Sequence, residues 1–243
     1  MLRFLLVFLV LPCFAQQTQI ANYDIDVQLH PDAKLLRAKQ VLYWTNTTAH
    51  PTKELHFHTY LNAFKDKEST FMKGSGGSLR NDVMDTRAKE NFGNIRITKA
   101  QLQNGVELSG EYIQPDNNNI ADQTVLRYTL KDPIQPRQQI AVYMEFDAKL
   151  PKIFARTGWA QGEYFFVGQW FPKIGVFEQD GRWNCHQFHA DTEFYADFGT
   201  YKVNITLPER FTVGASGQLT AEEKVGKGLK KISFKAEKEH DFA

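Results

Sequence analysis

Alternation of apolar and polar residues with a period of two runs through most of this chain, and it constrains the fold more than any other feature. Residues 23–29 (YDIDVQL) alternate strictly between the two kinds of side chain. Residues 36–45 continue in the same way, with Leu42 and Trp44 on the face opposite to Tyr43. Successive side chains of a β-strand point to opposite faces, so these patterns predict two strands that each bury one face.

Further segments carry the same strand pattern and are separated by turn-forming pairs such as Asn104-Gly105 and Asp180-Gly181. These segments are residues 54–59, 94–103, 124–130, 139–146, 201–207 and 231–235. Many short strands with few helical patterns favour a large curved sheet or a β-sandwich. The sequence therefore predicts a mainly β fold.

One stretch departs from the β pattern. Residues 65–91 are polar and include Gly74, Gly76 and Gly77. Residues 78–90 of this stretch have the composition of a short helix. We expect a surface insertion with a short helix, rather than a linker between two domains.

The first fifteen residues have the layout of a secretory signal peptide: Arg3, an apolar run over residues 4–10, and a small residue, Ala15, at the exit. The run is shorter than the roughly 20 apolar residues that span a membrane. We predict cleavage after Ala15 and export to the periplasm or the cell exterior. Lipidation at Cys13 is less favoured, because Pro12 precedes it in place of a small residue.

Charge and cysteine content limit the partners further. Lys and Arg total 29 against 28 for Asp and Glu, which gives a formal net charge of +1. This balance indicates neither nucleic acid nor a membrane surface as a partner, and no second apolar stretch is long enough to span a membrane. Removal of the signal peptide leaves Cys185 without a disulfide partner in the chain, so we expect a buried thiol.

Aromatic residues are densest between residues 159 and 201. They are Trp159, Tyr164, Phe165, Phe166, Trp170, Phe171, Phe177, Trp183, Phe188, Phe194, Tyr195 and Phe198, with Tyr201 at the end. Aromatic side chains favour buried sheet surfaces, so a packed core is the first interpretation. The alternative is that part of the cluster docks a partner or a neighbouring domain.

Candidate metal ligands are present, but their spacing is poor. His56 and His58 share one strand face, and Cys185, His186 and His189 follow on a later loop. A structural zinc site usually takes four ligands in two closely spaced pairs, and the chain has no H-E-x-x-H motif. We predict no metal site here, and core or surface histidines instead.

Motifs for other chemistry are equally weak. The chain has no G-x-S-x-G element and no P-loop. A small independent hydrolase is a further hypothesis, in which Asp191 or Glu193 would act with His186 or His189. Without further signals these carboxylates are ordinary surface acids.

An ordered set of motifs resembles the N-terminal domain of bacterial-type M1 zinc aminopeptidases over nearly the whole mature chain. The matching stretches are residues 23–29, 41–48, 54–58, 146–151, 168–174 (GQWFPKI), Trp183, 193–195, 197–201 (DFGTY), 203–208 and 213–217 (VGASG). The resemblance assigns residues 16–239 to this domain. Residues 240–243 (HDFA) are similar to the junction at which the family's catalytic domain begins.

The resemblance implies a saddle-like β domain that packs on a covalently following catalytic domain and closes one side of the cleft for a peptide substrate. In the family the zinc ion and its H-E-x-x-H motif belong to that catalytic domain, which this chain lacks. The chain alone should therefore be inactive. The alternative is a standalone exported β domain that binds a protein or a glycan through residues 159–201.

The resemblance also implies a substrate-binding element. In the family, a Q-x-E or Q-x-Q element about nine residues before a Phe-Pro or Leu-Pro pair helps to bind the peptide's free α-amino group, and a carboxylate suits that cation. Here Gln161 and Glu163 stand at that distance from Phe171-Pro172, although the residues between depart from the family's pattern. Glu163 is the main candidate, and a solvated loop acid is the alternative.

Overall fold

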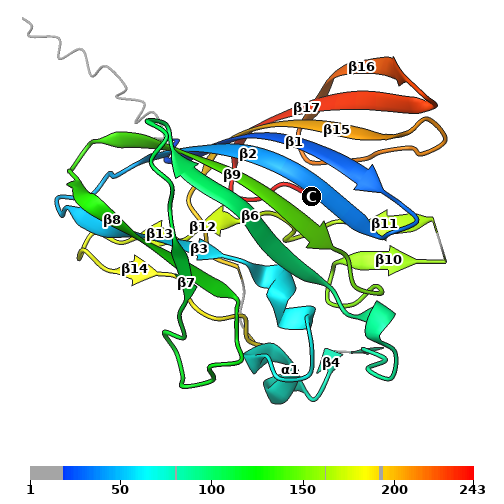
Figure 1. Ribbon diagram of the computed structural model, residues 1–243, viewed down its shortest axis with the longest axis horizontal. Helices are drawn as coiled ribbons and strands as arrows, with labels where there is room; N and C mark the ends of the chain where they lie inside the picture. The colour runs from blue at the N-terminus through cyan, green and yellow to red at the C-terminus, as the bar shows by residue number, and fades with distance from the viewer. Residues whose placement is uncertain (1–18, 80, 162, 192–193) are drawn as a thin grey trace, which may run out of the picture.

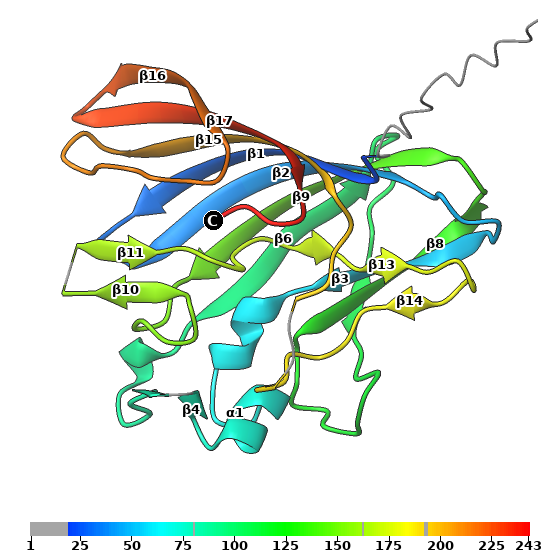
Figure 2. The same ribbon diagram turned by 180° about the vertical axis from the view of Figure 1, so that it is seen from behind.

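The computed structural model describes residues 19–243, apart from residues 80, 162 and 192–193. The predicted signal peptide and Glu193 lie outside the described residues. Figures 1 and 2 show a large curved sheet with the smaller sheet, the hairpins and the short helices gathered on one side of it. The prediction of a mainly β fold is confirmed.

The large sheet has seven strands in the order β16-β17-β15-β1-β2-β9-β6. They are β1 (Ala21–His30), β2 (Leu35–Thr45), β6 (Asn94–Leu102), β9 (Gln139–Lys149), β15 (Gly199–Pro208), β16 (Gln218–Gly226) and β17 (Leu229–Glu239). All neighbours are antiparallel except β1 and β15, which run parallel with Tyr23 opposite Tyr201. This parallel pair joins the first strand of the chain to the C-terminal strands β15, β17 and β16 in one sheet.

A four-stranded sheet, in the order β12-β3-β8-β7, faces the large one. Its strands are β3 (Thr52–His58), β7 (Gly110–Tyr112), β8 (Val125–Ile134) and β12 (Lys173–Ile174). Three two-stranded ribbons complete the β structure: β4 (Ser78–Leu79) with β5 (Asp82–Val83), β10 (Gly158–Ala160) with β11 (Tyr164–Phe166), and β13 (Val176–Phe177) with β14 (Trp183–Asn184). The helices are α1 (Thr70–Ser75) and the 3-10 turns η1 (Tyr60–Phe64) and η2 (Lys89–Asn91).

The core lies between the two sheets. Alternate side chains of β1 are buried, as their period-two pattern predicts, and the ring of Tyr23 stacks on that of Tyr201 with centroids 5.0 Å apart. Trp44 on β2 and Phe57 on β3 are almost completely buried in the same cluster. The buried amide of Gln40 also joins the layers, because its Nε2 donates to the carbonyl of Pro172 at 2.9 Å.

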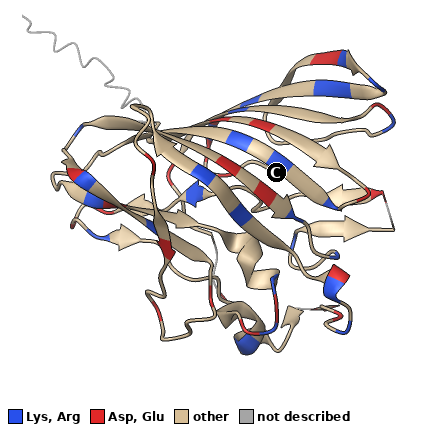
Figure 3. Ribbon diagram, viewed as in Figure 1, with Lys and Arg blue, Asp and Glu red and all other residues tan. Residues whose placement is uncertain are grey.

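The opposite face of the large sheet is polar. Figure 3 shows Lys and Arg interspersed with Asp and Glu along β2, β9 and β6. Asp147 binds both Arg37, at 3.0 Å, and Arg96, at 3.3 Å, and Lys39 lies 3.6 Å from Glu145. Mixed charges of this kind indicate a solvated face. Among the described residues, no helix is long and apolar enough to cross a membrane.

The predicted strands coincide with observed ones to within a few residues, but the helix predicted over residues 78–90 is wrong. Residues in that stretch form the β4–β5 ribbon, and the helix is α1, which lies earlier in the chain. The Ser69 side chain caps α1 by accepting from the N–H of Met72 at 3.1 Å, and Gly76 ends it with a φ of 62°. Local capping, rather than average helix propensity, therefore decided where the helix begins and ends.

Candidate functional site

The two residues implied in substrate binding lie at the turn of the β10–β11 hairpin. The hairpin pairs Trp159 with Phe165 and Ala160 with Tyr164, so Gln161 and Glu163 lie at its tip. Gln161 has a φ of 46°, and Gln161 and Glu163 are both exposed, while residue 162 is outside the described chain. The hairpin therefore presents both polar side chains to solvent.

Glu163 forms an ion pair with Arg210, which lies in the loop after β15. Arg210 donates from Nε at 2.9 Å and from Nη2 at 2.7 Å to the same oxygen, Oε1 of Glu163. These hydrogen bonds and the guanidinium charge lower the pKa of Glu163 and raise that of Arg210. The carboxylate therefore stays ionised at the tip of the hairpin.

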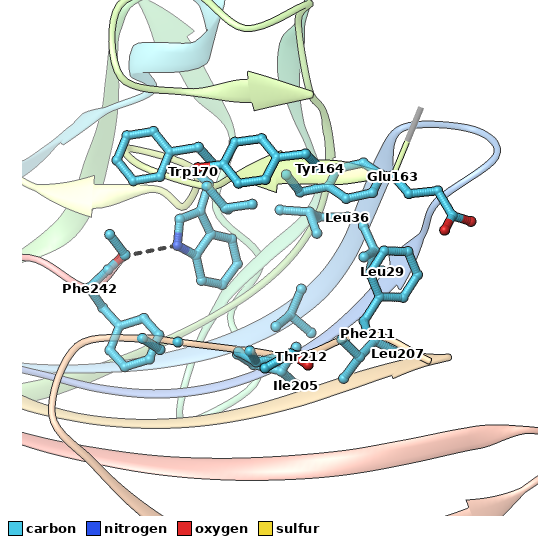
Figure 4. A pocket seen from close by; sticks show the side chains of 18 residues that line it. Leu29, Leu36, Glu163, Tyr164, Trp170, Ile205, Leu207, Phe211, Thr212 and Phe242 are labelled. Atoms are coloured by element: carbon cyan, nitrogen blue, oxygen red, sulfur yellow. Dashed lines mark hydrogen bonds between the residues drawn. The ribbon is translucent and has the colours of Figure 1, made fainter. Parts of the chain in front are cut away.

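An apolar cavity of about 640 Å³ lies between this hairpin and the large sheet. The sheet contributes Leu29, Leu36 and Ile205 to its wall, and Trp170 and Phe211 line it from the loops. Figure 4 shows Glu163 at the outer edge of this group, with its carboxylate directed away from Trp170. The cavity thus has apolar walls and an ion pair at its rim.

The C-terminal residues of the chain also line this cavity. Trp170 Nε1 donates to the carbonyl oxygen of Phe242 at 3.1 Å, as Figure 4 shows. Ser216 and Ala243 exchange hydrogen bonds, with backbone N of Ser216 2.8 Å from the carbonyl of Ala243. Asp241 lies 2.8 Å from the buried ammonium of Lys173. These contacts hold the segment against the fold.

A second polar cluster joins the candidate histidines of the later loop. Asp116 accepts from His186 Nδ1 at 2.5 Å, from His189 Nε2 at 2.9 Å and from the N–H of Gln187 at 2.7 Å. Partial burial would raise the pKa of Asp116, but these hydrogen bonds outweigh it and lower the pKa. Both imidazoles thus share Asp116. The hydrolase hypothesis paired them with Asp191 or Glu193, and Glu193 lies outside the described residues.

Of the other candidate ligands, His58 and Cys185 are buried and His56 is half-buried. His58 is buried with its Nδ1 3.5 Å from Cys185 Sγ, whereas His56 binds Glu54 at 2.9 Å and stacks on Trp183. Burial, together with the charge of the nearby Lys173, lowers the pKa of His58 to about 3, and burial raises that of Cys185. Among the described residues, no three His, Cys, Asp or Glu side chains converge to hold a metal ion.

Most of the aromatic region is core. Trp170, Phe171, Phe177, Phe188 and Tyr201 are buried. The exposed members are Tyr164, Phe166, Tyr195 and Phe198, of which Tyr164 is 57% exposed. Packing therefore explains most of the aromatic density, and only this small subset is open to a partner.

Arg210 is the residue of the site that the sequence analysis did not identify. It follows β15 in a Pro-Glu-Arg turn that carries no motif, and it is 47 positions away from Glu163. The side chains of Arg210 and Glu163 meet because β15 runs parallel to β1 in the folded sheet.

Sequence comparisons find no protein-family profile that matches this chain, and no curated protein matches it either. Solved structures do match. A two-domain M1 zinc metallopeptidase bound to L-arginine superposes with a TM-score of 0.50 and 16% identity, over 89% of this chain and 38% of that chain. An M1 zinc metallopeptidase from Deinococcus radiodurans gives a TM-score of 0.49 and 16% identity over the same shares.

These likenesses concern the fold. The described chain has the fold of an M1 aminopeptidase N-terminal domain, as its sequence motifs predicted. It spans 38% of the length of the two-domain structure that it matches. At 16% identity the superposition identifies the architecture and does not transfer an activity.

Proposed function

We propose that this chain is the N-terminal domain of an exported M1-type zinc aminopeptidase, in which it forms a scaffold and one wall of the substrate cleft. The observation that supports this most is the superposition on a two-domain M1 zinc metallopeptidase over 89% of the chain. The order of the sequence motifs, from residues 23–29 to residues 213–217, supports it independently. The reaction would be release of the N-terminal amino acid of a peptide.

Within that role, Glu163 would bind the free α-amino group of the peptide, with Gln161 beside it. An ionised carboxylate on an exposed tip suits an ammonium group, and a charge-assisted hydrogen bond is roughly twice as strong as a neutral one. Arg210 keeps Glu163 ionised without occupying both of its oxygens. A peptide without a free amine would lose this contact.

The zinc ion that the family implies does not fit the described residues of this chain, because no three potential ligands converge in them. His186 and His189 are engaged with Asp116, and His58 is enclosed in the core. Zinc and the residues that activate water would belong to the catalytic domain of the complete enzyme.

The first test is the intact mass and the activity of the native protein purified from its source organism. We expect a product several hundred residues longer than this chain, with chelator-sensitive release of N-terminal amino acids, and no release by the chain alone. Zinc-dependent aminopeptidase activity in the purified chain would contradict the domain assignment. A native mass equal to this chain without its signal peptide would do the same.

The second test concerns Glu163 in that native enzyme. Glu163→Gln should lower kcat/KM for an unblocked peptide roughly ten- to hundredfold, because the ammonium loses its charged partner. Zinc content should not change. The control is Glu90→Gln, an exposed acid on η2, which should behave as the unmodified enzyme does. Equal kinetics for the two variants would remove Glu163 from the site.

The alternative function, a standalone domain that binds a protein or a glycan, is favoured by the exposed aromatic side chains Tyr164, Phe166, Tyr195 and Phe198. Aromatic rings offer large contact areas to such ligands. Tyr164→Ala and Phe166→Ala would then abolish binding to a glycan array or a captured partner. Unchanged binding in both variants would count against it.

A further inference from the structure

The tip of the β10–β11 hairpin stands over the apolar cavity, while Trp159 and Phe165 pack against the core. Residues 163–167 line one wall, and Val27, Leu29 and Leu207 of the large sheet line the opposite one. A space of about 640 Å³ between them means that close packing does not fix the hairpin tip against the sheet. Side-chain contacts at the rim must therefore determine where the tip lies.

Two adjacent residues of the loop after β15 make those contacts. Arg210 binds Glu163 through two donors, and the ring of Phe211 meets that of Phe165 edge-on, with centroids 5.9 Å apart. Glu163 and Phe165 are thus both contacted from the loop after β15. The Arg210 guanidinium also lies 4.8 Å from the Phe211 ring centroid, which restricts its orientation.

A third side chain holds the hairpin from the β1–β2 turn. The ammonium of Lys34 lies 5.3 Å from the ring centroid of Trp159 and 5.2 Å from that of Phe165. Both distances are within the range of cation–π attraction. Phe165 is thus contacted by Lys34 as well as by Phe211. Among the described residues, the hydrogen bonds to the Glu163 carboxylate come from Arg210, and the charge of Lys34 also acts on it.

The geometry of the ion pair leaves one oxygen available. Both guanidinium donors go to Oε1 of Glu163, and none of the described residues donates a hydrogen bond to Oε2. A symmetrical fork would have occupied both oxygens. The observed arrangement fixes the carboxylate and leaves Oε2 free to accept from a cation.

We propose that Arg210, supported by Phe211, is a positioning residue that fixes the hairpin tip and turns the free oxygen of Glu163 toward a cationic ligand. The positioning role follows from the contacts above. Only the identity of the ligand, a peptide α-amino group, rests on the proposed function.

The test compares Arg210→Ala and Arg210→Lys with Arg182→Ala in the purified chain. Arg182 is a matched control, because it also donates from Nε and Nη2 to one oxygen, Oδ2 of Asp180, at 2.9 and 2.6 Å on an exposed turn. The readouts are NMR order parameters along residues 158–166 and the NMR titration of the Glu163 carboxyl group.

In Arg210→Ala we expect tip order parameters to fall below roughly 0.6, the range of flexible backbone. The pKa of Glu163 should rise, because its hydrogen bonds to Arg210 are lost. Arg210→Lys keeps the positive charge but loses the two-donor contact. It should therefore leave the pKa of Glu163 closer to its wild-type value than the order parameters of the tip. Arg182→Ala should change neither readout. Unchanged tip order and unchanged titration in Arg210→Ala would overturn the proposal.

A titration with L-leucinamide separates this proposal from the proposed function. We expect Arg210→Ala to raise Kd roughly tenfold through misplacement of the carboxylate, and Glu163→Gln to raise it further. If Arg210→Ala binds L-leucinamide with wild-type affinity and Glu163→Gln binds it more weakly, the positioning role of Arg210 is overturned and the α-amino role of Glu163 is supported. If Glu163→Gln binds L-leucinamide as tightly as the wild type does, and the tip of Arg210→Ala is disordered, the α-amino role of Glu163 is overturned and the positioning role of Arg210 is supported.

Discussion

Individual residues in this protein owe their properties to burial more than to their sequence neighbours. His56 and His58 are alternate residues of one strand, yet His56 binds an acid near the surface while His58 is enclosed beside Cys185. Both imidazoles have a lowered pKa, mainly through burial, and the effect is much larger for His58. The position of each ring relative to the core therefore decides its chemistry.

His58 should make stability depend on pH. Its pKa is about 3 in the folded state and about 6.5 in an unfolded chain, so between these values only the unfolded state binds the proton. Stability is thus unaffected above about pH 7 and falls as the pH decreases, by about 1.4 kcal/mol per pH unit from this group.

Urea unfolding at pH 7, 6, 5 and 4 measures this effect. The variant His58→Gln should be less stable at pH 7 but should lose less stability on acidification than the wild type. His50→Gln, at an exposed position, serves as the control and should keep the wild-type slope. Parallel slopes for His58→Gln and the wild type would show that His58 is not the group responsible.

At the scale of elements, specific side chains connect one sheet to the other. The hydroxyl of Tyr23 on β1 accepts from the N–H of Ile174 on β12 at 3.0 Å, in the buried space between the layers. Tyr201 stacks on Tyr23 and is buried as well, but no described residue hydrogen-bonds its hydroxyl. The two tyrosines therefore occupy similar surroundings with one difference, a hydrogen bond.

That difference gives a matched pair of substitutions. Tyr23→Phe should cost about 1–3 kcal/mol of unfolding free energy, because it leaves the buried N–H of Ile174 without an acceptor. Tyr201→Phe removes an unpaired polar atom and should be neutral or stabilising. Chemical denaturation of both variants measures the contrast, and equal losses would contradict this assignment.

At the scale of the whole molecule, one hydrophobic cluster extends through both sheets. Trp44 and Tyr23 from the large sheet, Phe57 from the small one and Phe71 from α1 belong to it. A single contiguous core should unfold as one unit. Trp159 and Phe165 of the β10–β11 ribbon pack against this core, and Phe177 of the β13–β14 ribbon belongs to it, so the ribbons should not form a separate unit.

We therefore expect a single thermal transition for the purified chain. Tryptophan fluorescence, which reports on buried Trp44 and Trp170, and far-UV circular dichroism should have coincident midpoints. Calorimetric and van't Hoff enthalpies should agree. Two resolved transitions would show that the sheets unfold independently.

The sequence by itself determined six of the seven strands of the large sheet, because a strand that buries one face alternates apolar and polar residues along the chain. It did not reveal β16, whose residues are all exposed and so carry no such alternation. It also misplaced the helix of residues 65–91, where capping by Ser69 and Gly76 outweighed average propensity.

The resemblance to the M1 family pointed to Gln161 and Glu163, through their spacing to Phe171-Pro172. Only the tertiary structure decided what surrounds Glu163. Because β15 runs parallel to β1, the end of β15 lies beside the end of β1. Arg210, in the loop that follows β15, therefore reaches the carboxylate of Glu163. Contacts between distant segments of this kind leave no periodic trace in a sequence, because they depend on the order of strands in the sheet and not on the neighbours of either residue.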